Sequence, residues 1–229
     1  MALKYKNVVP WGRNFEEYRR MFDLRENELT LRILGCGDGP ASFNWECNQK
    51  GGRVISVDPL YNLTRQEIQS RIQETYKDVM AQTERDKDKF KWDSIKSVAA
   101  LGEVRMKAMS AFLDSYEEGK IKGRYIPAAL PDLPFPNDAF DLSLCSHFLF
   151  LYTEQLSYEF HVKAIKEMLR VSREARFFPL LDLNAGRSPY ISKILLEFQA
   201  ECLEIRKVAY EFQIGGNELL IIKKTGRGG

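Results

Sequence analysis

Short apolar runs alternate along the chain with segments whose apolar residues recur every three or four positions. The runs lie at residues 31–34, 53–57, 124–128, 141–145, 175–181, 204–210 and 218–224. Runs of this length, bounded by turn residues, are typical of buried strands, and the segments between them are typical of amphipathic helices. Strands that alternate with helices predict an α/β domain with a mainly parallel sheet. The Gly215-Gly216-Asn217 segment between the last two runs predicts a hairpin.

Helix starts carry recognisable capping signals. We expect helices at residues 14–23, 40–49, 157–172 and 188–202. Asn14 with Glu17 forms a plausible N-cap pair, and Pro40 and Pro189 lie where the first turn of a helix tolerates proline. The apolar face of the first helix includes Tyr18, for which we expect core packing.

A long helical segment separates the second predicted strand from the third. Residues 61–122 are too many for an ordinary connection beside one helix, so we interpret them as an insertion in a single domain that spans residues 1–229. The capping box of Thr64 and Glu67 begins the first helix, and the polar run 83–91 separates it from a second amphipathic segment. The two helices form an antiparallel pair, or one crosses the sheet while the other covers its rim. The insertion is either a substrate-selecting lid or ordinary core. Arg105 and Lys107 on its second helix could meet an acidic substrate, but we expect them to be solvated.

A glycine-rich turn follows the first strand. Gly35, Gly37 and Gly39 give a backbone that can bend and approach a ligand closely, and the second strand ends at Asp58. In an open α/β sheet, ligands bind outside the carboxyl ends of strands, so the turn and this carboxylate should face one crevice. The third glycine of a G-x-G-x-x-G dinucleotide motif is missing, which disfavours a nicotinamide-dependent oxidoreductase.

The stretch LRILGCGDGPASF resembles the first motif of class I S-adenosylmethionine-dependent methyltransferases. One alignment places Gly35, Gly37 and Gly39 at the three small positions of that motif. The other, which we prefer, places Gly37, Gly39 and Ala41 there and leaves Gly35 where the family usually has an acid. Downstream, Leu133-Pro134-Phe135 and Phe140-Asp141-Leu142 resemble the segment between strands three and four of the same family.

The resemblance implies a doubly wound, seven-stranded, mainly parallel sheet of the Rossmann-like methyltransferase type, with an antiparallel last strand. It also implies methyl transfer from S-adenosylmethionine, with Asp58 accepting hydrogen bonds from the ribose hydroxyls. The family's adenine-binding acid is absent at Ala129, which implies adenine recognition by backbone groups. The residues expected to bind the cofactor are Gly35, Cys36, Gly37, Pro40, Asp58, Pro59, Leu60, Ala129, Leu130 and Ser146.

Two further expectations concern the reactive end of the site. The resemblance places His147 beside the transferable methyl group, where an imidazole could contact the substrate or act as a general base; the alternative is a histidine held by backbone hydrogen bonds at the strand end. It also allows Arg13 or Tyr18 to reach the methionine end. The alternative function is a regulatory protein that binds the cofactor without transferring its methyl group.

Composition and charge indicate which class of molecule the protein is expected to bind. A formal net charge of +2 gives no support to a nucleic-acid or membrane-surface partner, and no N-P-P-(Y/F) motif follows the fourth strand, so a small-molecule acceptor is favoured. The four cysteines lack metal-binding spacing. The N-terminal sequence lacks an apolar signal core, so we expect a cytoplasmic protein without a membrane span. The oligomeric state stays open.

Overall fold

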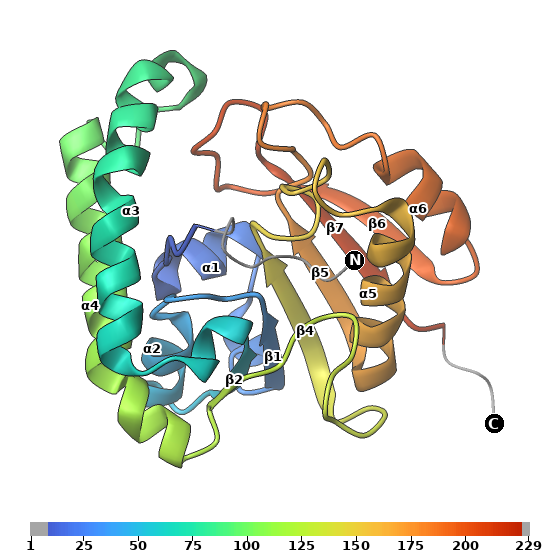
Figure 1. The fold of residues 1–229 in the computed structure, drawn as a ribbon. Helices are drawn as coiled ribbons and strands as arrows, with labels where there is room; N and C mark the ends of the chain where they lie inside the picture. Colours follow the sequence, from blue (N-terminus) through green and yellow to red (C-terminus); the bar gives the residue numbers. More distant parts are fainter. Residues whose placement is uncertain (1–8, 226–229) are drawn as a thin grey trace.

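A seven-stranded sheet forms the centre of the computed structural model, which describes residues 9–225 (Figure 1). The strand order is β3-β2-β1-β4-β5-β7-β6. The last strand, β7, runs antiparallel to the other six described strands, which confirms the predicted fold class. The strands are β1 (Arg32–Cys36), β2 (Arg53–Val57), β3 (Tyr125–Ile126), β4 (Phe140–Ser146), β5 (Ser172–Phe178), β6 (Cys202–Lys207) and β7 (Glu218–Lys223).

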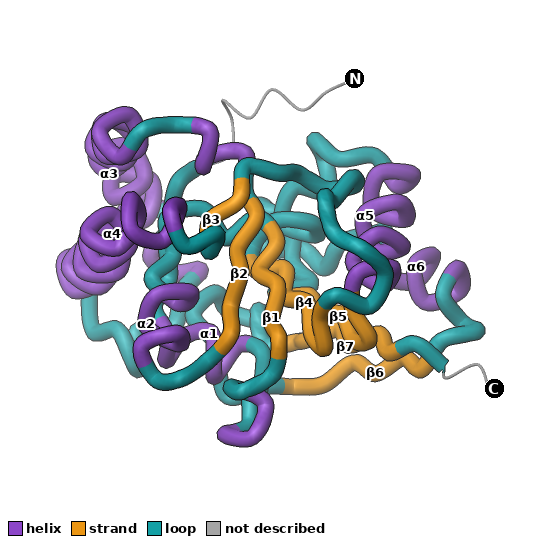
Figure 2. Tube along the Cα trace, turned by 90° about the horizontal axis from the view of Figure 1, so that it is seen from below, coloured by secondary structure: helices purple, strands orange, loops and turns teal. Residues whose placement is uncertain are grey.

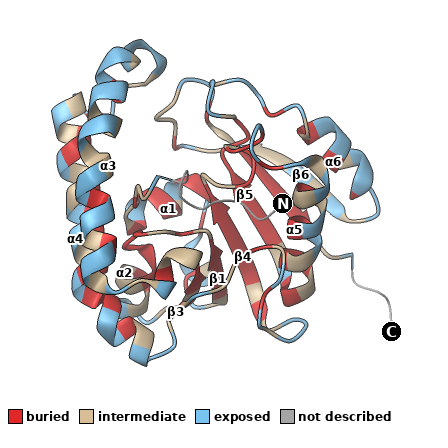
Figure 3. Cartoon of the chain, viewed as in Figure 1, coloured by how far each residue is buried: buried red, intermediate tan, exposed pale blue. Residues whose placement is uncertain are grey.

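Helices cover both faces of the sheet (Figure 2). On one face lie α1 (Phe15–Met21) and α2 (Phe43–Gln49), and on the other lie α5 (Tyr158–Val171) and α6 (Ile191–Glu197). Successive side chains of a strand point to opposite faces, so Ile33 packs with α1 and α2 while Leu34 packs with α5. The buried residues therefore lie on the strands and on the helix faces turned toward them (Figure 3). Short 3₁₀ helices occur at Glu26–Glu28, Pro59–Asn62 and Lys87–Lys89.

The insertion forms an antiparallel pair of helices, α3 (Arg65–Arg85) and α4 (Val98–Ile121), which lie side by side beyond the β3 edge (Figure 1). The capping box of Thr64 and Glu67 begins α3 as predicted. Ten residues of α4 are buried, against three of α3, because α4 packs on α2 and β3 while α3 lies outside it. The inner helix is thus part of the core, and the outer helix keeps a largely solvent-exposed surface.

The tip of the insertion contacts the loop between β6 and β7. The Lys91 amide donates to the carbonyl of Phe212 at 2.7 Å, and the Ile214 amide donates to the carbonyl of Lys89 at 2.9 Å. The rings of Phe90 and Phe212 stack at 4.9 Å. These contacts join the tip of the insertion to the loop between β6 and β7.

Several predicted boundaries are wrong. The helix after the glycine turn begins at Phe43, not at Pro40, because the turn itself continues to Ser42. The last helix covers only Ile191–Glu197, and β5 begins at Ser172 rather than 175. The two final strands pair antiparallel as predicted, but residues 208–217 make a long loop in place of a tight hairpin. Within residues 9–225, no helix is both long and apolar enough to cross a bilayer.

Candidate active site

A cavity of about 1210 Å³ opens at the carboxyl ends of β1, β2 and β4. The strand order reverses between β1 and β4, which is where ligands bind in open α/β sheets. Nine of the eleven residues predicted for the site line this cavity: Gly37, Pro40, Asp58, Pro59, Leu60, Ala129, Leu130, Ser146 and His147. Gly35 and Cys36 do not line it, since they lie inside β1 beneath the turn.

Three glycines of the turn have a structural reason, two from the backbone and one from a neighbouring side chain. Gly37 and Gly39 have φ angles of +71° and +52°, in the left-handed region that L side chains rarely adopt. A Cβ on Gly35 would lie 1.8 Å from Oδ2 of Asp38. The geometry therefore favours the alignment through Gly35, Gly37 and Gly39 and corrects our preference for the one that ends at Ala41.

Asp38 is a buried carboxylate that the sequence reading missed. Its Oδ1 accepts a hydrogen bond from the Tyr18 hydroxyl at 2.9 Å, and its Oδ2 accepts one from the Ser56 hydroxyl at 2.5 Å. Burial raises the pKa of Asp38 to about 6, although both hydrogen bonds oppose that rise. The only sequence signal for this residue is an acid inside a glycine turn. Its hydrogen-bond partners, Tyr18 on α1 and Ser56 on β2, are distant in sequence and could not be assigned from it.

Asp58 follows β2, and its carboxylate links the glycine turn to the segment after β2 by hydrogen bonds. Its Oδ2 accepts a hydrogen bond from the Gly39 amide at 2.9 Å, and its Oδ1 accepts one from the Leu60 amide at 2.8 Å. Burial raises the pKa of Asp58, and these two backbone donors act against the rise. Each carboxylate oxygen has a further lone pair, so the side chain can accept additional hydrogen bonds from a ligand.

His147 follows β4 in a left-handed conformation, with φ of +49°. Its Nδ1 lies 2.9 Å from the Ser146 hydroxyl, its amide donates to the carbonyl of Phe178, and its ring packs edge-on against the ring of Phe178. Burial lowers the pKa of His147 well below its ordinary value, and the charges of Arg13 and Arg105 lower it further. The imidazole is therefore uncharged at neutral pH.

Two N-terminal side chains complete the sheet side of the cavity. Tyr18 stacks on Phe43 at 4.3 Å, so it is a core residue as predicted, and it also lines the cavity. Arg13 lines the cavity as well, and its Nη1 donates to the carbonyl of Trp11. The Nε of Arg13 is buried with no hydrogen-bond partner among the described residues. This donor is available to an anionic group.

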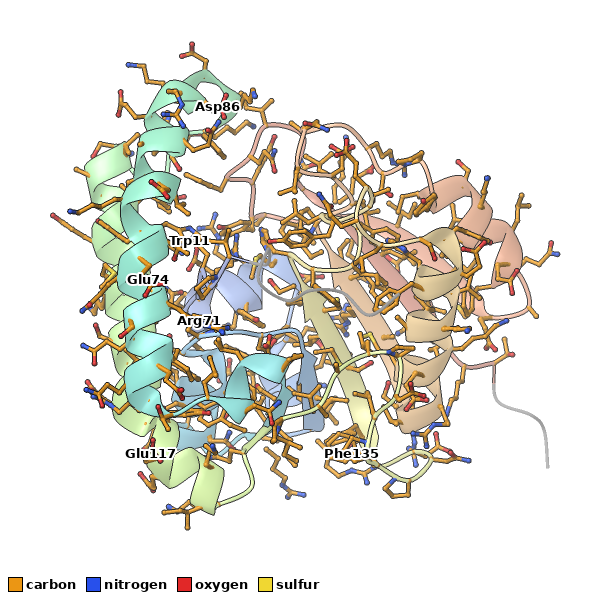
Figure 4. All side chains as sticks on the ribbon, in the orientation of Figure 1. Trp11, Arg71, Glu74, Asp86, Glu117 and Phe135 are labelled. Carbon is orange, nitrogen blue, oxygen red and sulfur yellow. The ribbon has the colours of Figure 1, made fainter. Side chains whose placement is uncertain are left out.

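The outer wall of the cavity is one polar face of α3. Trp11 and Arg71 lie on the side of α3 that faces the sheet (Figure 4). Five of the α3 side chains that line the cavity recur every three or four residues, and four of these five are charged, with both signs present: Arg71, Glu74, Asp78, Gln82 and Arg85. Thr75, Val79, Ala81 and Thr83 of the same helix also line it. The sequence reading did not select them, because exposed charges on a helix are ordinarily solvated.

Arg105 was expected to be solvated, and that expectation is wrong. Its side chain is 1% exposed, and its Nη1 lies 2.7 Å from Oε2 of Glu17 on α1. The Tyr210 hydroxyl donates to the other oxygen of Glu17 at 3.0 Å. Lys107 is exposed as expected. The pair ties α4 to α1, and the Arg105 charge contributes to the lowered pKa of His147.

The strand order, the antiparallel β7 and the glycine turn facing an acid at the end of β2 define the class I S-adenosylmethionine-dependent methyltransferase fold. No protein-family model matches the chain. A protein of Methanocaldococcus jannaschii, described as uncharacterized protein MJ0045, is 39% identical over 224 residues, which cover 97% of this chain and 99% of that protein. The chain belongs to the same family as that protein.

Solved structures with a similar fold are more distant. The magnesium protoporphyrin IX methyltransferase of Synechocystis PCC 6803, with bound SAM, gives a TM-score of 0.43 at 14% identity, covering 92% of this chain and 91% of that one. The protein PH0226 of Pyrococcus horikoshii OT3 gives 0.46 at 12% identity, covering 98% and 100%. A SAM-dependent methyltransferase of Aquifex aeolicus gives 0.42 at 12% identity, covering 91% and 92%.

Proposed function

We propose that this protein is an S-adenosylmethionine-dependent methyltransferase that acts on a small-molecule acceptor. The observation that carries the proposal is the pairing of the Gly37–Gly39 turn with Asp58 across one cavity, at the point where the strand order reverses. Backbone groups of such a turn suit the methionine part of the cofactor, and a carboxylate at the end of β2 suits two ribose hydroxyls.

The residues around the cavity fit this cofactor at each of its ends. Pro59, Leu60, Ala129 and Leu130 supply apolar walls for adenine, in agreement with the lack of a carboxylate at position 129. At the opposite end, the unpartnered Nε of Arg13 offers a hydrogen bond to the methionine carboxylate. Gly35 and Cys36 contribute indirectly, as the end of the strand that supports the turn.

The bound cofactor supplies an electrophilic methyl group, and the chain supplies placement, exclusion of water and a proton acceptor. Ser146 and His147 lie at the end of β4, beside the glycine turn. Burial keeps His147 neutral, which is the form able to take a proton from an acceptor hydroxyl or amine. We assign His147 the role of general base.

The acceptor would then lie between His147 and the polar face of α3. Both charges occur along that face, which suits a polar small molecule better than an extended polyanion. We propose that α3 selects the acceptor as the outer wall of a single domain, while α4 belongs to the core. A cytoplasmic location stays a prediction from the sequence.

Titration calorimetry tests the cofactor assignment directly. We expect S-adenosylmethionine and its demethylated product to bind, and NADH, as the control for a dinucleotide-binding protein, not to bind. Failure of both methionine compounds to bind would contradict the proposal, and tight NADH binding would favour an oxidoreductase. Binding without turnover on any acceptor offered would favour a non-catalytic binding protein.

A further inference from the structure

Both backbone polar groups of Gly39 are bonded to the segment that follows β2. The Gly39 amide donates to Oδ2 of Asp58 at 2.9 Å, and the Gly39 carbonyl accepts a hydrogen bond from the Tyr61 hydroxyl at 2.8 Å. A carbonyl oxygen can only accept, so the direction of the second bond is fixed. Gly39 has a φ of +52°, and a Cβ placed on it would meet nothing within 4 Å in residues 9–225 apart from its chain neighbours. Two hydrogen bonds, rather than packing, therefore hold this point of the turn.

Tyr61 reaches the turn from the hydrophobic core. It lies on the short 3₁₀ helix Pro59–Asn62 and is completely buried. Its ring packs against Phe112 and Tyr116 of α4 and against Tyr125 of β3, with centroid distances of 5.2–6.0 Å. Since Tyr61 does not itself line the cavity, its hydroxyl can act on a bound ligand only through the turn.

Tyr116 connects the 3₁₀ helix to α4. Its hydroxyl lies 3.0 Å from the carbonyl oxygen of Tyr61 and 2.8 Å from that of Leu63. Both partners can only accept, so the single proton of Tyr116 is directed at these two carbonyls. The start of the same segment is held by Asp58, whose Oδ1 accepts a hydrogen bond from the Leu60 amide at 2.8 Å. Hydrogen bonds of 2.8–3.0 Å thus run from α4 through the 3₁₀ helix to the glycine turn.

We propose that Tyr61 and Tyr116 are positioning residues for the S-adenosylmethionine site, and that α4 thereby holds the glycine turn in its binding conformation. This inference rests on the proposed function for the identity of the ligand. Glycine adopts many backbone conformations, so a turn that loses the Tyr61 bond samples conformations that do not bind. The free energy needed to order the turn is then subtracted from the free energy of binding. The insertion therefore supports the cofactor site through α4, in addition to the cavity wall that α3 provides.

The state of the turn can be measured without any ligand. Asp38–Gly39 is the only Asp–Gly step in the 229 residues, so ¹³C-carbonyl aspartate combined with ¹⁵N-glycine labelling isolates the Gly39 amide in a single NMR correlation. We expect this amide to exchange with solvent about two- to tenfold faster in Tyr61→Phe than in the wild type, the scale of one lost hydrogen bond. A folded Tyr61→Phe variant with unchanged Gly39 exchange would overturn the inference.

Titration calorimetry measures the effect on the cofactor. In Tyr61→Phe, S-adenosylmethionine and its demethylated product should both bind about two- to tenfold more weakly, and by the same factor, because both present the same groups to the turn. Tyr116→Phe should weaken both compounds in the same direction. Tyr125→Phe is the matched control, because that hydroxyl belongs to the same aromatic cluster but lies 3.3 Å from the Ser115 hydroxyl, away from the turn. It should leave both Kd values and the Gly39 exchange unchanged even where it lowers Tm.

Unchanged Kd values in Tyr61→Phe and Tyr116→Phe, or an equal change in Tyr125→Phe, would overturn the positioning role and leave the methyltransferase assignment standing. If Tyr61→Phe fails to fold, Tyr116→Phe decides the question by the same two measurements, since its hydroxyl does not contact the turn directly. A wild-type protein that binds neither methionine compound would instead contradict the proposed function. Faster Gly39 exchange in Tyr61→Phe would in that case still identify the two tyrosines as supports of the turn.

Discussion

The buried pair of Arg105 and Glu17 gives the sharpest prediction about stability. In Arg105→Met the aliphatic stem is largely preserved, but the Glu17 carboxylate stays buried without its nearest cation. Breaking a buried pair in this way costs about 3–5 kcal/mol. We expect the lower end, near 3 kcal/mol, because Glu17 keeps the hydrogen bonds from Tyr210 and from the Asn14 amide and lies near the charge of Arg13. For a chain of this length the loss corresponds to a fall in Tm of about 6–12 °C.

The same variant has a defined pH dependence. Burial acts to raise the pKa of Glu17, but the charges of Arg105 and Arg13 outweigh it, so the pKa lies below its ordinary value. In the wild type this group therefore contributes stability above its unfolded pKa of about 4.3, and that contribution is lost as pH falls through the folded pKa. Without Arg105 burial dominates and the folded pKa should rise, so the penalty should be largest at pH 7 and shrink toward pH 4.

Urea unfolding of the variant at pH 7 and pH 4 measures both effects. Adding Glu17→Gln to Arg105→Met should recover part of the loss at pH 7, because the uncompensated charge is gone. Lys107→Met is the control on the same helix and should change the free energy of unfolding by no more than about 0.5 kcal/mol, since Lys107 is exposed. A loss below about 1 kcal/mol, or one of equal size at both pH values, would refute this account of the pair.

The remaining predictions concern the site. Asp58→Ala should weaken S-adenosylmethionine binding by about 1–3 kcal/mol, or about 5- to 150-fold in Kd by calorimetry, and unchanged affinity would remove the ribose role. Gly35→Ala should lower the free energy of unfolding by about 1–3 kcal/mol because its Cβ would overlap the Asp38 carboxylate; adding Asp38→Ala should restore part of it, and no recovery would point to another clash. Once an acceptor is known, His147→Ala should reduce kcat more than cofactor affinity, whereas equal losses would indicate a structural role.

Local patterns were sufficient for most of the fold. Strand runs, the capping box at Thr64 and the polar break at 83–91 depend on neighbours in sequence, and the structure confirms the sheet and the antiparallel pair. The predicted start of α2 at Pro40 is wrong, because the chain becomes helical only at Phe43. A proline restricts φ but does not by itself show whether a helix or an extended segment follows.

The buried charges could not be placed from local patterns. Arg105 lies four residues from Leu101 and from Met109, on the apolar stripe of α4, and a charge on such a stripe is the one signal the sequence offered. Its partner Glu17 is 88 positions away, so only the packing of α4 against α1 shows that the charge is compensated. The charged side chains of α3 that line the cavity could not be selected from sequence for a different reason. Their spacing is that of an ordinary solvent-exposed helix face.

The position of Asp38 in the structure explains why residue 35 is glycine. In the alignment that ends at Ala41 it stands where the resemblance implies an acid, and the absence of acids at Gly35 and Ala129 is the only sequence support for a non-catalytic protein. In the structure an acid occupies the space directly over Gly35, entering from three residues later and bonded to Tyr18 on α1 and Ser56 on β2. A carboxylate is therefore present at this point of the turn, and the glycine is the condition for it. A relative with any larger residue at the equivalent of Gly35 must shift its Asp38 equivalent away, and would then lose the hydrogen bonds from the equivalents of Tyr18 and Ser56.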